Sequence, residues 1–137
     1  GAMSSFNKLD KNSAYVEEYK RINKNWNEVN DNSVNVKITT LDKYIKFNKI
    51  KSIDYLKIDV QGWEPEVLRG ARESLKKGVI KNIELEFMIA QAYDGTVSFS
   101  DFDSILCKNK YKLIAINNYG DVVSNKNLSI DVIYTRH

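Results

Sequence analysis

The chain has 137 residues, 42% of them hydrophobic and 28% charged, which suits one globular domain and excludes wholesale disorder. Its net charge of +3 arises from Lys and Arg scattered among Asp and Glu, without the one-sided basic stripe of a nucleic-acid binder. No run approaches the roughly 18 apolar residues of a membrane helix and no signal-peptide core is visible, so we expect neither nucleic acid nor membrane as a partner.

The first 32 residues contain little that could build a core. Residues 1–3 (GAM) resemble the scar of a cleaved vector-encoded tag, so we set them aside and expect residue 4 to lie inside a longer natural chain. Residues 4–32 are rich in Asn, Lys and Glu and form a polar N-terminal arm. Within this arm, Asn12 or Ser13 is placed to cap one short helix.

From residue 33 onward, strand and helix patterns alternate, and we expect one α/β domain over residues 33–137. Residues 33–40 (SVNVKITT) alternate apolar and polar side chains, which predicts a half-buried strand. Thr40 is then the expected N-cap of a helix over residues 41–49. Residues 54–60 (DYLKIDV) predict a second strand, whose apolar face is formed by Leu56, Ile58 and Val60.

The next helix is expected over residues 64–77. Pro65 suits its first turn and Gly78 its end, because proline lacks the amide hydrogen that a first turn leaves unused and glycine tolerates a left-handed cap. Its apolar stripe consists of Val67, Leu68, Ala71 and Leu75.

Residues 79–87 (VIKNIELEF) predict a third strand with two different faces. Ile83, Leu85 and Phe87 point one way, and Glu84 and Glu86 point the other way. Alternation of this kind is typical of a strand with one buried face.

A fourth helix is expected over residues 98–109, capped by Ser98 or Ser100. It contains Cys107, the single cysteine, which we expect to be a small buried hydrophobe. Because one cysteine cannot form an internal disulfide, we expect a reducing compartment and a cytoplasmic location.

Residues 111–118 and 129–136 predict the last two strands, joined around Gly120. Crossovers through helices favour parallel pairing of the earlier strands, and a simple turn favours antiparallel pairing of the last two. The expected fold is therefore an α/β domain with a mostly parallel sheet and an antiparallel final strand pair.

Carboxylates gather where two expected strands end. Asp59 ends the second strand, Gly62 permits a tight turn, Glu64 begins the next helix, and Glu86 lies near the end of the third strand. In open α/β sheets ligands bind at the carboxyl ends of the strands. Three converging carboxylates could raise the pKa of one of them for proton abstraction, or hold a divalent metal ion through oxygen ligands.

Structural explanations of the same residues stay open. A carboxylate in the first turn of a helix, such as Glu64, is stabilised by the helix dipole. Asp59 could cap the same turn, although a charge after a near-continuous apolar run usually has a partner or a function. Glu84 alternates with apolar residues and fits a solvent-facing position.

Other kinds of site find little support. His137 is the only histidine, and there is no cysteine pair, no G-x-S-x-G elbow and no glycine-rich phosphate loop. Trp26, Trp63 and the eight tyrosines could form an aromatic platform for sugars, although core or interface positions explain them equally well.

A longer motif carries a resemblance to a known family. The segment TTLDKYIKFNKIKSIDYLKIDVQGWEPEVLRGA and the later IELEFMIAQAYDGTVSFSDFDSILCKNKYKLIAI resemble the FkbM-type methyltransferases over most of residues 33–117, most specifically between Ile53 and Ala71. The resemblance implies the C-terminal half of a Rossmann-like domain that transfers a methyl group from S-adenosylmethionine to a hydroxyl of a saccharide or natural product. It also implies that the glycine-rich cofactor loop precedes residue 4.

The resemblance also implies roles for single residues. Asp59, Glu64 and Glu86 match family carboxylates and are the candidate catalytic residues, with Asp59 and Gly62 beside the cofactor. Gln61, which replaces the commoner glutamate, and Tyr93 would line the acceptor side, and a divalent metal could assist at ligands that the motif does not specify. The alternative is a non-catalytic module derived from a methyltransferase half-domain, which could form a homodimer through an exposed sheet edge.

Overall fold

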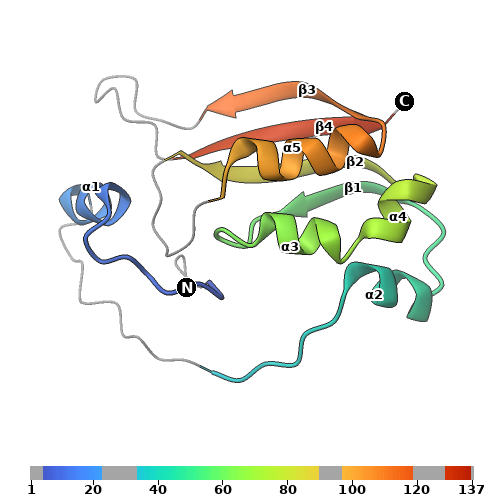
Figure 1. Ribbon diagram of the computed structural model, residues 1–137, viewed down its shortest axis with the longest axis horizontal. Coiled ribbons are helices and arrows are strands. Elements are labelled where there is room, and N and C mark those ends of the chain that lie inside the picture. Colours follow the sequence, from blue (N-terminus) through green and yellow to red (C-terminus); the bar gives the residue numbers. More distant parts are fainter. Residues whose placement is uncertain (1–4, 23–33, 90–96, 119–128, 137) are drawn as a thin grey trace.

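A computed structural model of the chain describes residues 5–22, 34–89, 97–118 and 129–136, which build a four-stranded sheet with helices packed on it (Figure 1). The order of the strands across the sheet is β1-β2-β4-β3. Their bounds are Ile53–Ile58 for β1, Ile80–Met88 for β2, Tyr111–Asn118 for β3 and Ser129–Arg136 for β4.

Only one of the three strand pairs in this sheet is parallel. β1 and β2 run parallel, as expected for strands joined through helices, and β3 and β4 form the predicted antiparallel pair. However, β4 also lies antiparallel to β2, because it returns between β2 and β3 and opposes both neighbours. The prediction of a mostly parallel sheet was therefore wrong.

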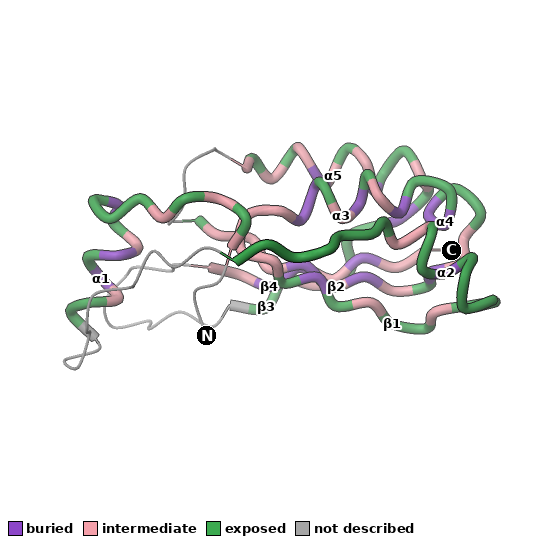
Figure 2. Tube along the Cα trace, turned by 90° about the horizontal axis from the view of Figure 1, so that it is seen from below, coloured by how far each residue is buried: buried purple, intermediate pink, exposed green. Residues whose placement is uncertain are grey.

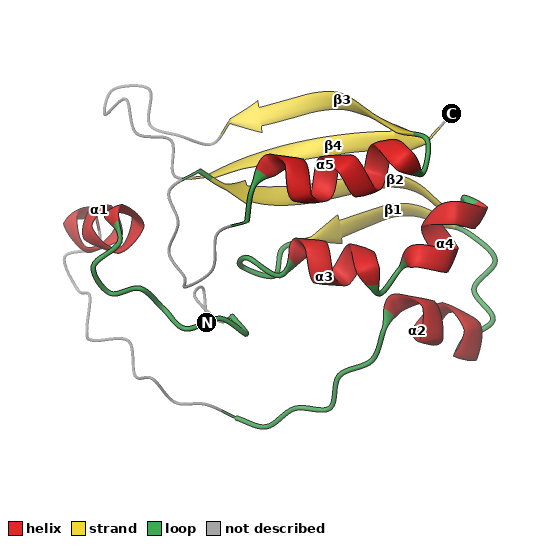
Figure 3. Ribbon diagram, in the orientation of Figure 1, coloured by secondary structure: helices red, strands yellow, loops and turns green. Residues whose placement is uncertain are grey.

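Helices cover one face of the sheet, so that the described residues form two layers (Figures 2 and 3). The helices are α1 (Ala14–Ile22), α2 (Leu41–Phe47), α3 (Glu64–Arg69), α4 (Arg72–Lys77) and α5 (Phe99–Lys108). Of these, α3, α4 and α5 lie over the sheet, and α2 contacts α4. The core lies between the two layers and includes Leu68, Leu75, Ile83, Leu85 and Phe102, all with no exposed surface.

The helix expected over residues 64–77 is divided into α3 and α4 by an interaction with α2. The carbonyl oxygen of Gly70 accepts a hydrogen bond from the Asp42 amide at 2.9 Å instead of continuing the helix. The carboxylate of Asp42 then accepts hydrogen bonds from the amides of Glu73 and Ser74, both at 2.9 Å, at the start of α4. Gly78 ends α4 with φ 71°, as predicted for a left-handed cap.

The strand predicted over residues 33–40 is not present. Residues 34–40 lack regular secondary structure, and Val34, Val36 and Ile38 are 79%, 59% and 74% exposed. An alternating segment becomes a strand only when a neighbouring strand bonds its backbone, and within the described residues this segment pairs with none of the four strands. The prediction of a strand at this position was therefore wrong, although the segment alternates as a strand does.

Helix α5 begins as predicted, whereas its cysteine is placed differently. Ser98 accepts a hydrogen bond from the Ser100 amide, and Asp101 accepts one from the Ser98 amide, which forms a capping box. Cys107 is exposed, so the prediction of a buried cysteine was wrong. The buried stripe of α5 contains Phe102 and Leu106, and the position after Leu106 turns away from the sheet.

Candidate functional site

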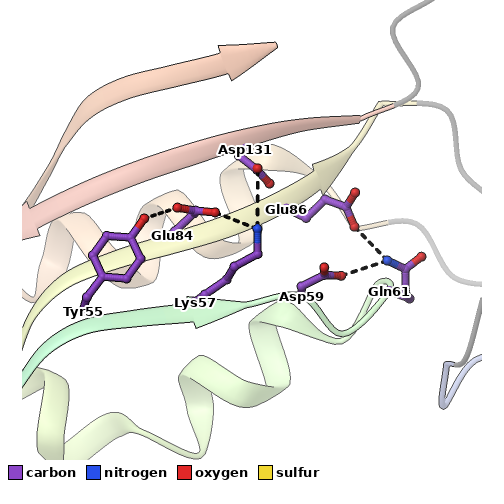
Figure 4. A network of polar contacts seen from close by, with 7 residues as sticks. All are labelled: Tyr55, Lys57, Asp59, Gln61, Glu84, Glu86 and Asp131. Atoms are coloured by element: carbon purple, nitrogen blue, oxygen red, sulfur yellow. Dashed lines mark hydrogen bonds and ion pairs between the residues drawn. The ribbon is translucent and has the colours of Figure 1, made fainter. Parts of the chain in front are cut away.

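The structure brings Asp59 and Glu86 together at the carboxyl ends of β1 and β2. Ile58 and Leu85 are partners in the parallel ladder of β1 and β2, so the residues that follow them lie side by side. The side-chain amide of Gln61 joins the two carboxylates, with its Nε2 atom 2.9 Å from Asp59 Oδ1 and 2.8 Å from Glu86 Oε2 (Figure 4). Two of the three predicted carboxylates therefore converge.

The loop that carries Gln61 has an unusual backbone. Gln61 has φ 53° and Gly62 has φ 95°, both in the left-handed region that side chains other than glycine disfavour. The loop reverses direction tightly between the end of β1 and Trp63, the residue that precedes α3. This turn brings the Gln61 side chain back over the end of β1.

Glu64 lies on the other side of the same loop. It is 3% exposed, and its carboxylate accepts hydrogen bonds from the amides of Val60 at 3.2 Å and Gly62 at 3.1 Å. Glu64 therefore has a structural role in the loop, although the structural alternative considered for it was the helix dipole and bonds to loop amides had not been predicted for it. Glu64 does not join Asp59 and Glu86 at Gln61.

A second polar cluster continues along the face of the sheet that α3, α4 and α5 leave uncovered. Lys57 Nζ lies 2.7 Å from Glu84 Oε1 and 3.6 Å from Asp131 Oδ2, and the Tyr55 hydroxyl donates a hydrogen bond to Glu84 (Figure 4). Asp131 lies directly opposite Glu86 in the antiparallel ladder. The ammonium group of Lys57 therefore lies near two carboxylates, those of Glu84 and Asp131.

Sequence reasoning did not identify Tyr55, Lys57 or Asp131 as members of this face. Tyr55 and Lys57 could have been found, because they alternate with the apolar residues of β1 and must share the face of Asp59. Asp131 could not have been found, because only the pairing of β4 with β2 places it opposite Glu86.

The surroundings of Glu86 raise its pKa above that of an ordinary glutamate. Partial burial raises the pKa of Glu86 most, and the nearby carboxylates of Asp59 and Asp131 raise it further, against a hydrogen bond from Ser129 that lowers it. By contrast, the hydrogen bond from Lys57, assisted by Tyr55, lowers the pKa of Glu84. Two carboxylates on one strand thus differ in acidity, which is the arrangement that acid–base chemistry uses.

Helix α1 contributes a tyrosine to the electrostatic surroundings of the pair. Burial raises the pKa of the Tyr15 hydroxyl, and the charges of Glu86 and Asp59 raise it further. The capped helix predicted in the N-terminal arm is confirmed, since the Ser13 hydroxyl accepts a hydrogen bond from the Val16 amide.

Tyr93, which was predicted to line the acceptor side of the site, lies outside the described residues. Within the part of the chain that the structure describes, no group of three or more acidic, histidine or cysteine side chains is arranged to hold a metal ion, so the predicted carboxylate cluster is reduced to a pair. None of the described helices has the length and apolarity needed to cross a bilayer.

One comparison with known proteins yields a match. Residues 2–113 match the family described as the methyltransferase FkbM domain. The match extends through the N-terminal arm, beyond the segment in which the sequence motifs are recognisable. No curated protein and no solved structure matches the chain.

Proposed function

Because the chain belongs to the methyltransferase FkbM domain family, we propose that it serves the transfer of a methyl group from S-adenosylmethionine to a hydroxyl of a saccharide or natural product. The observation that carries this proposal is the pair formed by Asp59 and Glu86 on the amide of Gln61. The pair lies at the carboxyl ends of two parallel strands, where α/β enzymes bind their ligands.

In this proposal, the acidic pair handles the proton of the acceptor hydroxyl. A carboxylate with a raised pKa is a better base near neutral pH than an ordinary one, and the pKa of Glu86 is raised by burial and by its acidic neighbours. Glu86 accepts the proton that the acceptor hydroxyl loses, and Asp59 orients the hydroxyl. Gln61 holds both groups in place, and Tyr93 completes the acceptor side.

The described residues fit only part of a site for the methyl donor. When bound, S-adenosylmethionine supplies an activated methyl group. Asp59 is exposed and can accept hydrogen bonds from its amino or hydroxyl groups. Gly62 does not fit a cofactor cradle, because a side chain there would meet Asn7 Nδ2 at 3.3 Å, so the N-terminal arm fills that space. We therefore propose that most donor contacts come from a segment preceding residue 4.

Titration calorimetry tests this division of the site. We expect S-adenosylmethionine to bind weakly or not at all to these 137 residues, and to bind to a chain extended upstream. In the extended chain, Asp59→Asn should weaken donor binding, whereas Glu86→Gln should preserve it and lower the transfer rate by roughly 10²–10⁴-fold. Tight binding by the 137 residues alone would show that the donor site lies elsewhere.

An assembly function is the second candidate, and one observation favours it. β1 is an edge strand, and the exposed, alternating segment 34–38 in the same chain has the pattern of a strand without a partner. Segment 34–38 of a second copy could pair with the free edge of β1, which would complete both elements in a homodimer. The test of this function is the oligomeric state of the protein in solution.

A further inference from the structure

Residues 5–7 of the N-terminal arm lie directly against the loop that carries Gln61. The Ser5 hydroxyl donates a hydrogen bond to the Gln61 carbonyl oxygen at 2.7 Å. The Trp63 indole nitrogen donates one to Asn7 Oδ1, also at 2.7 Å. Between them, the ring of Phe6 packs on the ring of Trp63 with a centroid separation of 4.8 Å. We call residues 5–7 the clasp.

The clasp is itself ordered by a local hydrogen bond. The Asn7 amide donates to the Ser5 hydroxyl oxygen at 3.1 Å, which leaves the hydroxyl hydrogen free to bond the Gln61 carbonyl. A hydroxyl that both accepts and donates has a fixed orientation. The contact of Ser5 with Gln61 therefore depends on a defined backbone turn and not on a freely rotating hydroxyl.

The loop needs such support from outside. A residue other than glycine in the left-handed region costs about 1–2 kcal/mol, and Gln61 occupies it with φ 53°. Glu64 holds the amides of Val60 and Gly62 from inside the turn. The carbonyl of Gln61 itself is held by Ser5 of the clasp.

The backbone of Gln61 decides where its side-chain amide can reach. Both carboxylates accept from the same Nε2 atom, so each of its two hydrogens must point at one carboxylate. If φ of Gln61 returned to the ordinary region, the side chain would swing away and both bonds would be lost. The clasp contacts the backbone of Gln61, and the side chain of Gln61 contacts both carboxylates. The clasp therefore acts on the acidic pair through Gln61.

We propose that the clasp positions the acidic pair: residues 5–7 fix the backbone of Gln61 so that its amide bridges Asp59 and Glu86. The clasp residues and Gln61 are positioning residues, because they act through the two carboxylates. The positioning of the acidic pair by the clasp follows from the contacts of residues 5–7 with Gln61 and Trp63. The importance of this positioning for methyl transfer rests on the proposed function.

The proposal predicts the titration of Glu86 in clasp variants. The described titratable groups that act on the Glu86 carboxyl are Asp59, Asp131 from β4 and Tyr15 from α1. An N–H donor stabilises the charged carboxylate, so loss of the Gln61 amide should move the Glu86 midpoint upward. Carbon-13 NMR of the side-chain carboxyl measures that midpoint in the chain as it stands, without any cofactor.

Three variants and one control define the experiment. Ser5→Ala with Asn7→Ala removes both clasp hydrogen bonds, and Gln61→Ala removes the bridge itself. Trp63→Phe is the conservative variant, because it keeps the ring that packs on Phe6 and removes only the indole donor. Ser74→Ala is the matched control, because it removes one hydroxyl hydrogen bond, to Asp42, within α4 and away from the loop that carries Gln61.

We expect the Glu86 midpoint to rise in Gln61→Ala and in the double clasp variant, with a smaller rise in Trp63→Phe and none in Ser74→Ala. The Gln61 side-chain amide signals should also move toward those of a free glutamine in the clasp variants. If the double variant is too unstable to titrate, Trp63→Phe decides the question. An unchanged or lowered midpoint, or an equal rise in Ser74→Ala, would overturn the proposal. Since methyl transfer is not measured, this result is independent of the proposed function.

Discussion

Asp42 shows at the scale of a single residue how a carboxylate can organise two helices. Its oxygens accept the hydroxyl of Ser74 at 2.6 Å and the amides of Glu73 and Ser74 at the start of α4, while its own amide bonds Gly70. Burial acts to raise the pKa of Asp42, but the hydrogen bonds from Ser74 and Glu73 outweigh it and lower the pKa below its usual value. The aspartate in the TTLD motif thus caps a helix thirty residues away in sequence.

Replacing Asp42 should therefore destabilise the fold in a way that depends on pH. We expect Asp42→Ala to reduce the free energy of unfolding by about 1–2 kcal/mol at neutral pH, as for other lost N-terminal caps. A lowered pKa means that this contribution is complete above the ordinary aspartate pKa and is lost as the pH falls through the pKa of the folded state. Urea unfolding between pH 7 and pH 3 measures the difference from the wild type.

The matched control for Asp42 is Asp54→Ala. Asp54 is exposed, and among the described residues its side chain pairs with Lys81 alone, so its loss should change stability little at any pH. Equal losses in the two variants would contradict a capping role for Asp42. A difference from the wild type that stayed constant down to pH 3 would contradict the ionised form as the one that bonds.

At the scale of an element, α5 is defined by signals at its ends and by one buried stripe. The capping box of Ser98 and Asp101 fixes its first turn, and Phe102 and Leu106 attach it to the sheet. Phe87 of β2 meets Phe99 and Phe102 edge to face, with centroids 5.7 Å apart in both pairs. The helix is therefore positioned by its first two turns, near the carboxyl end of β2.

Ser98→Ala should weaken α5 at its beginning. Loss of the N-cap is expected to lower the free energy of unfolding by about 1 kcal/mol, because the Ser100 amide loses its acceptor. Ser104→Ala in the exposed middle of the helix is the control, and it should leave stability unchanged or slightly raised, since alanine has the higher helix propensity. Thermal unfolding compares the two, and an equal effect would argue against the cap.

At the scale of the whole molecule, the described sheet has an edge strand on each side, β1 and β3, and the assembly function concerns the edge formed by β1. β1 pairs only with β2, and the segment 34–38 that should have provided a strand is exposed. An edge strand has unpaired backbone N–H and C=O groups and tends to pair with a strand of another chain. The helix layer and the acidic face are complete without this edge, so its pairing concerns assembly and not the formation of the pair at Gln61.

Sedimentation over a range of concentrations tests the pairing of this edge with a second copy. We expect the wild type to dimerise with rising concentration and Val36→Lys to shift it toward the monomer, because a charge in the middle of an alternating segment opposes strand addition. Phe47→Lys is the control, since Phe47 is equally apolar and 85% exposed but lies on α2. A wild type that stays monomeric at all concentrations would count against the assembly function.

Features that depend on local patterns could be predicted from the amino-acid sequence. The cap at Thr40 and the stop at Gly78 were predicted, and Ser13 and Ser98 were each one of two predicted caps, because capping chemistry involves residues that are neighbours in sequence. The apolar faces of β1 and β2 were predicted from their alternation. The resemblance to FkbM methyltransferases, which the family match bears out, likewise rested on contiguous residues.

Contacts between residues distant in sequence could not be predicted and became visible in the folded chain. The return of β4 between β2 and β3 placed Asp131 opposite Glu86, and the clasp brought Ser5 to Gln61 across 56 positions. The exposure of residues 34–38 was equally invisible, because a strand pattern does not reveal whether a partner strand exists. Such contacts depend on strand order and register, which follow from the packing of the whole chain and leave no periodic signal in any one segment.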